Sequence, residues 1–238
     1  MTNERSFNTL PDWPTLLPQM PSAAFRTSPH DEALAIQRRR QIFLAACRVL
    51  ERKSFHEASV KELALEAGLA AGSIYVYLDS KDEILVLIAE SMVAELVDQL
   101  PAIHERTGDD PRLELAAVMH EILNIIDRYR EAFAVLHHEA RYLAQRTQYK
   151  TAMNRIGDRY LSAVAEVIER GRKAGVIQVD DVPSAVHAIQ MLCAGWAVGG
   201  HGLRHSDKES YWREISRLVE GRFLAPRVES KSNGREEF

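Results

Sequence analysis

Histidine and glutamate side chains, the types that bind metal ions or transfer protons, stand together at two places in this 238-residue chain. One run is His137-His138-Glu139 and the other is His120-Glu121. Adjacent residues on a helix point in different directions, so neither run converges on a single ion. The zinc-binding spacing His-Glu-x-x-His is not completed either, because position 124 is asparagine. The sequence therefore predicts no metal site.

Nucleophilic catalysis has as little support. The run Gly199-Gly-His-Gly202 is similar to a loop that binds an oxyanion, yet no Gly-x-Ser-x-Gly turn accompanies it. The two cysteines, Cys47 and Cys193, lie far apart within apolar helical patterns, as is typical of reduced, buried thiols in a cytoplasmic protein. We therefore expect a protein that is not an enzyme and that carries no cofactor.

Three consecutive arginines, Arg38-Arg39-Arg40, could bind the phosphates of a nucleic acid. Three arginines alone would more commonly be a solvated helix face, and the formal net charge of −4 does not indicate a nucleic-acid partner. Residues 31–81 hold eight Lys/Arg against seven Asp/Glu. Binding to DNA would therefore depend on a local cationic surface, which an acidic remainder can hide in the total.

The segment that follows has the pattern of two short helices joined by a tight turn. Ser59-Val-Lys-Glu62 is a capping box that starts a helix, and Gly68 ends that helix, since glycine adopts the left-handed conformation cheaply. In the second helix, Ile74 and Leu78 share an apolar side. Its other side chains are small or hydroxylated: Ala70, Ala71, Gly72, Ser73, Tyr75 and Tyr77. This pattern predicts a helix-turn-helix, whose second helix fits the major groove of DNA.

This stretch and the helices on either side resemble the DNA-binding head of the TetR family of repressors. The resemblance covers about 50 residues, and its specificity comes from the unbroken order of many short signals. The matching runs are Arg39-Arg40-Gln-Ile42 through Ala46, Ser59-Val-Lys-Glu-Leu63-Ala64, Ala67-Gly68-Leu69, Gly72-Ser73-Ile74-Tyr75, Tyr77-Leu78 and Ser80-Lys81-Asp82-Glu83-Ile84-Leu85.

The resemblance implies which residues meet a double-stranded DNA operator. It places Ala71, Ser73, Tyr75, Val76 and Tyr77 near bases and phosphates, and Ser59, Lys61 and Lys81 on the DNA backbone. We expect Arg38, Arg39 and Arg40 to reach the backbone as well. The alternative for Tyr75 is a core aromatic with a hydrogen-bonded hydroxyl. The recognition helix has no Arg, Asn or Gln, so base specificity would depend on methyl contacts, hydroxyls and DNA shape.

The remaining chain is helical by its spacing, and no stretch has the pattern of a strand. We predict an all-α protein with a first helix over about 31–52, then long helices that begin near Ser80, Pro111, Gln145, Pro183 and Ser206. The helix over 113–126 has only a narrow polar stripe, which indicates a central element of a bundle. No apolar run is long enough to cross a membrane, and the N-terminus has no secretory signal.

Four segments follow from these patterns. Residues 1–30 hold five of the nine prolines and are predicted to be disordered, or an extended arm that docks on the body or a partner subunit. Residues 31–80 form the DNA-binding domain, and 81–226 form a helical domain for ligand binding and dimerisation. Residues 227–238 form a flexible tail.

In TetR-like proteins the larger domain binds a small effector among its middle helices, and binding reduces DNA affinity. Side chains of the types expected to line such a site are more often plain core than ligand contacts: Met119, Ile122, Ile126, Tyr129, Phe133, His137, Arg141, Tyr142, Tyr149, Met153, Tyr160, Met191 and Trp196. The segment Leu136–Leu143 is similar to one in family members that respond to acyl-CoA thioesters. There Arg141 would bind an anionic phosphate moiety. The alternative is a surface pair with Glu139 that contributes almost nothing.

A homodimer is expected, because two identical heads can read a palindromic operator. The resemblance implies that the last two helices of each subunit form the interface. The small residues of 183–200 suit close approach between helices. The alternative is that they serve packing within one chain. The prediction is a ligand-responsive repressor released from DNA by a small hydrophobic or acyl-CoA-type effector. Alternatives are a drug-sensing repressor of an efflux gene, and an architectural DNA-binding protein without a metabolic effector.

Overall fold

The computed structural model describes residues 32–203 and 206–225, and the segments predicted as an N-terminal arm and a C-terminal tail lie outside these ranges. Within the described residues the chain forms eight α-helices and two short 3₁₀-helices, and its one extended pairing is an isolated bridge between Ile177 and Leu224. The predicted all-α fold is confirmed. No helix in these ranges is long and apolar enough to span a lipid bilayer.

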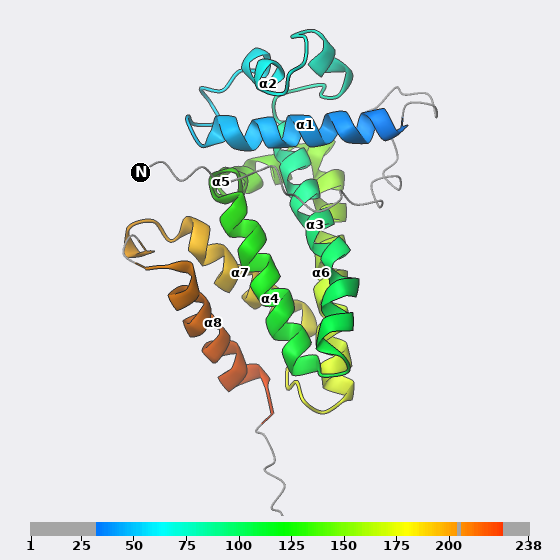
Figure 1. The fold of residues 1–238 in the computed structure, drawn as a ribbon, viewed down its shortest axis with the longest axis vertical. Helices are drawn as coiled ribbons and strands as arrows, with labels where there is room; N and C mark the ends of the chain where they lie inside the picture. Colours follow the sequence, from blue (N-terminus) through cyan, green and yellow to red (C-terminus); the bar gives the residue numbers. More distant parts are fainter. Residues whose placement is uncertain (1–31, 204–205, 226–238) are drawn as a thin grey trace, which may run out of the picture.

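The N-terminal part consists of α1 (Glu32–Leu50), α2 (Val60–Glu66) and the 3₁₀-helix η3 (Ser73–Val76), with α1 lying across one end of the long helices (Figure 1). The Ser59 side chain accepts a hydrogen bond from the Glu62 backbone N–H, as expected of an N-cap. The Glu62 carboxylate instead pairs with Lys53, 2.6 Å away, so only half of the capping box forms. Gly68 has a φ of 68° and ends α2, as predicted.

The helix α3 (Glu83–Thr107) runs from this part into the bundle and buries an apolar face that includes Ile84, Ile88 and Leu96. The Ser80 side chain does not cap this helix. The N-cap is Asp82, which makes no side-chain cap bond, and the Glu83 carboxylate accepts a bond of 2.7 Å from the Asp79 backbone N–H.

The bundle is completed by α4 (Pro111–Arg128), α5 (Arg130–Gln145), α6 (Thr147–Lys173), α7 (Val182–Val198), the 3₁₀-helix η4 (Gly200–Leu203) and α8 (Lys208–Phe223). The helix α4 packs against α3, α6, α7 and α8, and is therefore central, as its narrow polar stripe indicates. The helices α3 and α5 also contact α1. Through them the bundle supports the N-terminal part.

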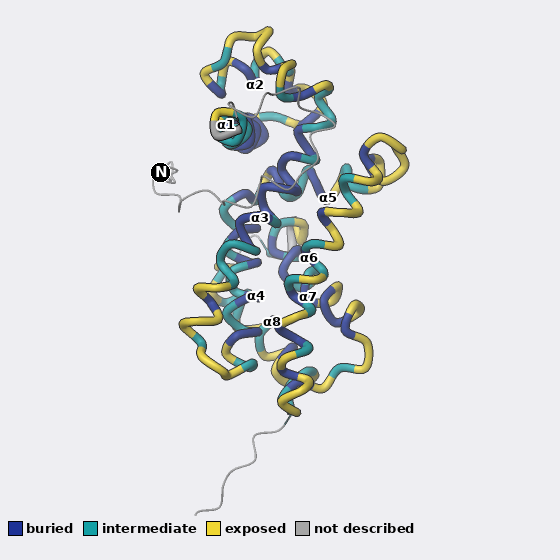
Figure 2. Tube along the Cα trace, turned by 90° about the vertical axis from the view of Figure 1, so that its right-hand side faces the viewer, coloured by how far each residue is buried: buried dark blue, intermediate teal, exposed yellow. Residues whose placement is uncertain are grey.

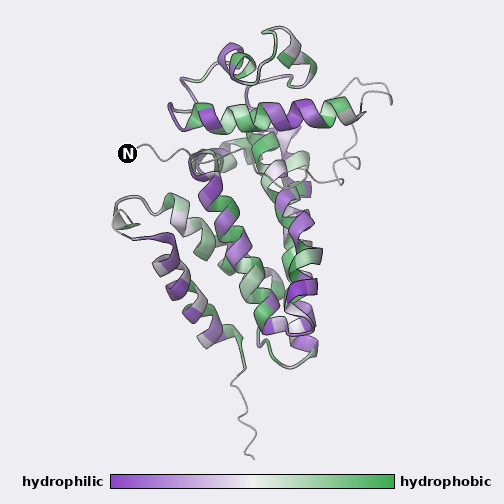
Figure 3. Cartoon of the chain, in the orientation of Figure 1, coloured by the Kyte–Doolittle hydropathy of each residue, from purple (hydrophilic) through white to green (hydrophobic). Residues whose placement is uncertain are grey.

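One apolar core extends from α1 into the bundle, and buried residues recur along the whole described chain (Figure 2). Phe43 of α1 packs edge-on against Tyr129 at the end of α4, with 4.8 Å between ring centroids. Apolar residues on the long helices turn inward, while α8 is largely hydrophilic on its outer side (Figure 3). Cys47 and Cys193 are buried free thiols within this core, as predicted.

Buried carboxylates in the bundle are each paired with an arginine, because an unpaired buried charge is costly. Glu90 on α3 pairs with Arg39, and Glu95 pairs with Arg128. At the far end, Glu114 accepts a bond of 2.5 Å from Arg170. These pairs join helices that are distant in the sequence.

Candidate functional site

The turn between α2 and α3 presents an exposed surface built from small, hydroxylated and aromatic side chains. Ala71, Gly72 and Ser73 are exposed, and so are Tyr75 and Val76. Tyr75 is 58% exposed, which rules out the alternative that it is a core aromatic. The buried side chains of Ile74 and Leu78 hold this turn on the core.

Lys61 is the cation of α2 that faces solvent beside this turn, and it makes no ion pair within the part of the chain that the structure describes. The other cations nearby are paired. Arg52 and Arg48 both bond the Glu66 carboxylate, at 2.5 and 2.6 Å, and together they lower the pKa of Glu66, with the Arg52 hydrogen bond as the largest cause. The surface therefore has few uncommitted positive charges.

Two residues predicted to touch DNA phosphates have partners within the protein. The Arg39 guanidinium pairs with Glu90 of α3 and its side chain is only 15% exposed. The Lys81 ammonium donates to the His56 carbonyl at 3.0 Å and lies over the Phe55 ring, 4.7 Å from its centroid. Arg39 is therefore paired with α3 of the bundle, and Lys81 has its partners within the head. Their contact with DNA phosphates stays a prediction.

The other two arginines of the triplet also have partners in the protein. Arg38 donates to the Gln41 side chain at 2.8 Å and is half-buried. Arg40 interacts electrostatically with Tyr129, at the end of α4. Ser59 and Lys61, which are predicted to contact the DNA backbone, are exposed. Tyr77, on the recognition turn, is half-buried.

The N-terminal end of α6 contacts the head directly. The Tyr149 and Ser80 hydroxyls are 2.6 Å apart, and Arg146 bonds the Asp82 carboxylate at 3.0 Å. On α5, the Glu139 carboxylate lies 3.4 Å from the His56 ring. These polar contacts tie the bundle to both sides of the recognition turn.

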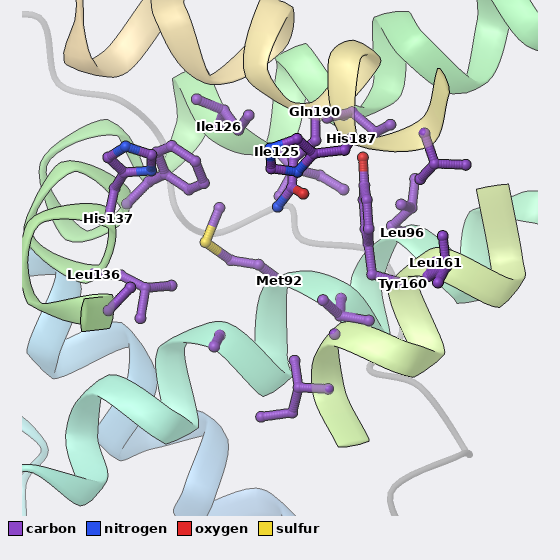
Figure 4. A pocket seen from close by; sticks show the side chains of 18 of the residues that line it. Met92, Leu96, Ile125, Ile126, Leu136, His137, Tyr160, Leu161, His187 and Gln190 are labelled. Atoms are coloured by element: carbon purple, nitrogen blue, oxygen red, sulfur yellow. The ribbon is translucent and has the colours of Figure 1, made fainter. Parts of the chain in front are cut away.

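A cavity of about 410 Å³ lies among α3, α4, α5, α6 and α7 (Figure 4). Its volume is within the range of small-molecule sites. Six of the predicted lining residues do line it: Ile122, Ile126, Phe133, His137, Met153 and Tyr160. The walls are mostly aliphatic, and their polar side chains are those of His137, Tyr160, His187 and Gln190.

Seven predicted lining residues lie outside the walls: Met119, Tyr129, Arg141, Tyr142, Tyr149, Met191 and Trp196. Several have other partners. The Tyr129 hydroxyl donates to the Glu95 carboxylate at 3.0 Å, and the Trp196 indole N–H donates to Asp127 at 2.8 Å. Arg141 and Tyr142 are exposed on α5. Helical spacing shows which residues share a face of a helix. It does not show which face of each helix bounds the cavity.

Some residues of the cavity wall were not predicted from the sequence. Met92 and Leu96 belong to the inward face that helical spacing identifies on α3, but nothing in their spacing separates a cavity wall from plain core. His187 and Gln190 stand on α7, whose small residues by themselves indicate only a close-packing surface. Their spacing of three, which places both on one face of the helix, is the signal that could have found them.

The Tyr160 side chain combines a cavity wall with a buried phenol. Its hydroxyl makes no hydrogen bond to any residue that the structure describes. Burial strongly raises the pKa of this phenol. A buried hydroxyl without a partner is uncommon and costs free energy.

The fold and these surfaces define a helix-turn-helix protein with a helical bundle that encloses a cavity. Two family models match the chain: the bacterial regulatory proteins of the tetR family over residues 42–88, and the tetracyclin repressor-like C-terminal domain over residues 108–197. The chain belongs to the TetR family of bacterial regulators.

Its relatives in sequence are distant regulators. The fatty acid metabolism regulator protein of Bacillus subtilis is 28% identical over 34% of this chain and 42% of that protein. The nicotine-responsive repressor HdnoR of Paenarthrobacter nicotinovorans is 27% identical over 38% of this chain and 44% of that protein. The repressor KstR2 of Rhodococcus jostii is 24% identical over 60% of this chain and 69% of that protein. The chain thus spans less than half the length of the first two.

Solved structures share the fold. The regulator FadR of Bacillus subtilis, in complex with stearoyl-CoA, has a TM-score of 0.64 at 20% identity and covers 76% of this chain and 96% of its own. A regulator from Saccharomonospora viridis, in complex with choline, has a TM-score of 0.64 at 21% identity. The match covers 80% of this chain and 99% of that protein. The ligands of these two proteins differ greatly in size and charge, so the shared fold does not select an effector.

Proposed function

We propose that the protein is a ligand-responsive transcriptional repressor, whose head binds an operator in double-stranded DNA and whose cavity takes a small hydrophobic effector. The observation that carries this proposal is the double role of α6. This one helix supplies Met153, Ile156 and Tyr160 to the cavity wall, and its first turn supplies the Tyr149 contact to Ser80 beside the recognition turn.

A ligand can change DNA affinity only if it binds the two arrangements of the protein unequally. A molecule that fills the cavity contacts α6, because that helix contributes five of the lining residues. A shift of α6 would reach Ser80 and Asp82 through Tyr149 and Arg146. The geometry therefore supports an effector that favours a head orientation unsuited to DNA.

A homodimer would present two such heads to a palindrome, and the outward sides of α7 and α8 are the surface we assign to it. Met191 and Val198 of α7 and Leu218 of α8 are exposed apolar side chains on these helices. Some small residues of α7 are used within the chain, since a Cβ at Gly195 would clash with the Tyr211 hydroxyl oxygen. Ala188, by contrast, is exposed and free for close approach to a partner.

The effector class follows from the walls and their surroundings. Aliphatic walls support a hydrophobic molecule. An acyl-CoA-type effector is supported by Arg141, which is exposed one turn beyond His137 on α5 and makes no hydrogen bond within the described chain. An acyl chain would then occupy the cavity while the anionic part stays outside, near Arg141.

The test is a footprinting experiment on the DNA that flanks the coding region of this protein. We expect one short protected palindrome, with half-sites about one duplex turn apart. A panel of acyl-CoA thioesters and uncharged hydrophobic compounds is then added, and at least one is expected to release the DNA. Protection that spreads along the DNA without a boundary, or the absence of salt-sensitive DNA affinity, would reject the repressor assignment.

A further inference from the structure

The cavity has no residue that could neutralise an ionised ligand by a fixed charge. Among the described residues that line it there is no Asp, Glu, Lys or Arg. The buried carboxylates of α3 are already paired, Glu95 with Arg128 and Glu90 with Arg39. An ion placed between aliphatic walls without a partner would lose its hydration and gain nothing in exchange.

The polar side chains of the walls are unevenly placed. His187 and Gln190 are one turn apart on α7 and therefore share a face of that helix. The Tyr160 hydroxyl lies toward them, whereas His137 stands on the opposite side of Met92 (Figure 4). Neither His187 nor Gln190 makes a side-chain hydrogen bond to any residue that the structure describes. The α7 end of the cavity thus holds three of its four polar side chains, His187, Gln190 and Tyr160, and none of the three makes a side-chain hydrogen bond to a described residue.

We infer that the part of the effector enclosed in this cavity is an uncharged, mostly aliphatic group that bears a carbonyl, and that Gln190 and His187 hydrogen-bond this carbonyl. A ketone and an ester fit this description, whereas a free carboxylate does not. The inference rests on the proposed function, because it specifies the chemistry of the effector in the same cavity.

The experiment measures displacement of N-phenyl-1-naphthylamine, an uncharged fluorescent dye, from the full-length protein. The competitors are decan-2-one, decane and decanoate, which match in length and differ in the head group, at a pH well above the pKa of a carboxylic acid. We expect decan-2-one to compete about tenfold better than decane, the effect of one hydrogen bond. Decanoate should compete worse than the ketone.

Variants assign the preference to α7. Gln190→Leu should reduce the advantage of decan-2-one over decane at least threefold, as measured by the ratio of the two affinities. The matched control is Gln145→Leu, since Gln145 is exposed at the end of α5 and lies outside the lining. This control should leave the ratio unchanged.

Three results would overturn the inference: decanoate competing as well as the ketone, a ketone preference that survives in Gln190→Leu, or no binding of the dye and the ketone. The assay contains no DNA. A failure of the protein to bind or release an operator would therefore count against the proposed function and leave this result in place.

Discussion

The phenol oxygen of Tyr149, in the first turn of α6, lies 2.6 Å from the hydroxyl oxygen of Ser80, which follows the recognition turn and precedes α3. One turn further along, α6 contributes Met153 to the cavity wall. The two hydroxyls therefore join the head to the helix that a bound effector would displace.

A double-mutant cycle measures this contact. Tyr149→Phe and Ser80→Ala should each lower the free energy of unfolding by about 1 kcal/mol, because each removes one partner of the same half-buried hydrogen bond. The double variant should lose little more than either single one, with a coupling energy of about 1 kcal/mol. Urea unfolding gives these values. Strictly additive losses would show that the hydroxyls do not interact in solution.

Tyr160→Phe should act in the opposite direction to Tyr149→Phe. The Tyr160 hydroxyl is buried without a partner among the described residues, so its removal should raise the free energy of unfolding by about 1 kcal/mol. Both substitutions remove one oxygen from a buried tyrosine of α6, which makes them a matched pair. A loss of stability in Tyr160→Phe, measured by urea unfolding without ligand, would contradict this prediction.

Tyr75→Ala should abolish operator binding in a gel-shift titration. Because Tyr75 is exposed on the recognition turn, the substitution should change the free energy of unfolding by less than about 0.5 kcal/mol and leave the oligomeric state unchanged. Tyr142→Ala is the control, since Tyr142 is an exposed tyrosine of α5 away from this turn. Unchanged DNA affinity in Tyr75→Ala would remove this turn from the interface.

The two lysines near the recognition turn should behave differently. Lys61→Ala should reduce the slope of log affinity against log salt concentration by about 1 for each phosphate that the lysine neutralises, with no effect on stability. Lys81→Ala should instead lower the free energy of unfolding by about 1 kcal/mol, because Lys81 bonds the His56 carbonyl. DNA titrations at several salt concentrations, together with urea unfolding, separate these roles. Equal salt slopes for wild type and Lys61→Ala would exclude Lys61 from binding a phosphate.

Acid should weaken the contact between α1 and α2 through Glu66. Hydrogen bonds from Arg52 and Arg48 lower the pKa of this carboxyl below its ordinary value of 4.5. Because the pKa of Glu66 is lower in the folded state, its ion pairs stabilise the fold fully above the ordinary pKa. This contribution to stability is lost as the pH falls through the folded-state pKa.

The matching variant is Glu66→Gln, which should cost less than about 1 kcal/mol at neutral pH, as is usual for ion pairs near the surface. The difference in unfolding free energy between wild type and variant should shrink as the pH falls below about 4.5. Urea unfolding at a series of pH values measures it. A difference that stays constant with pH would mean that the ion pairs contribute nothing.

Local rules predicted the elements of this protein, since they act over a few residues. Ser59 caps α2 through a bond to a residue three positions away, and Gly68 ends the same helix because its φ of 68° disfavours a side chain. The inward positions of Ile74 and Leu78 followed from helical spacing alone. Family membership could be inferred from the same short-range signals in order.

Tertiary structure alone decided which side chains meet across the fold. Ser80 and Tyr149 are 69 positions apart, and Arg39 and Glu90 are 51 apart, so no local pattern pairs them. The sequence identified Arg39 and Lys81 as cations able to bind phosphate, and only the structure shows the partner that each has inside the protein. The cavity arose in the same way. Whether an inward side chain such as Met92 or Met119 meets a cavity or plain core depends on how five helices fit together, because the space between helices is a property of their packing.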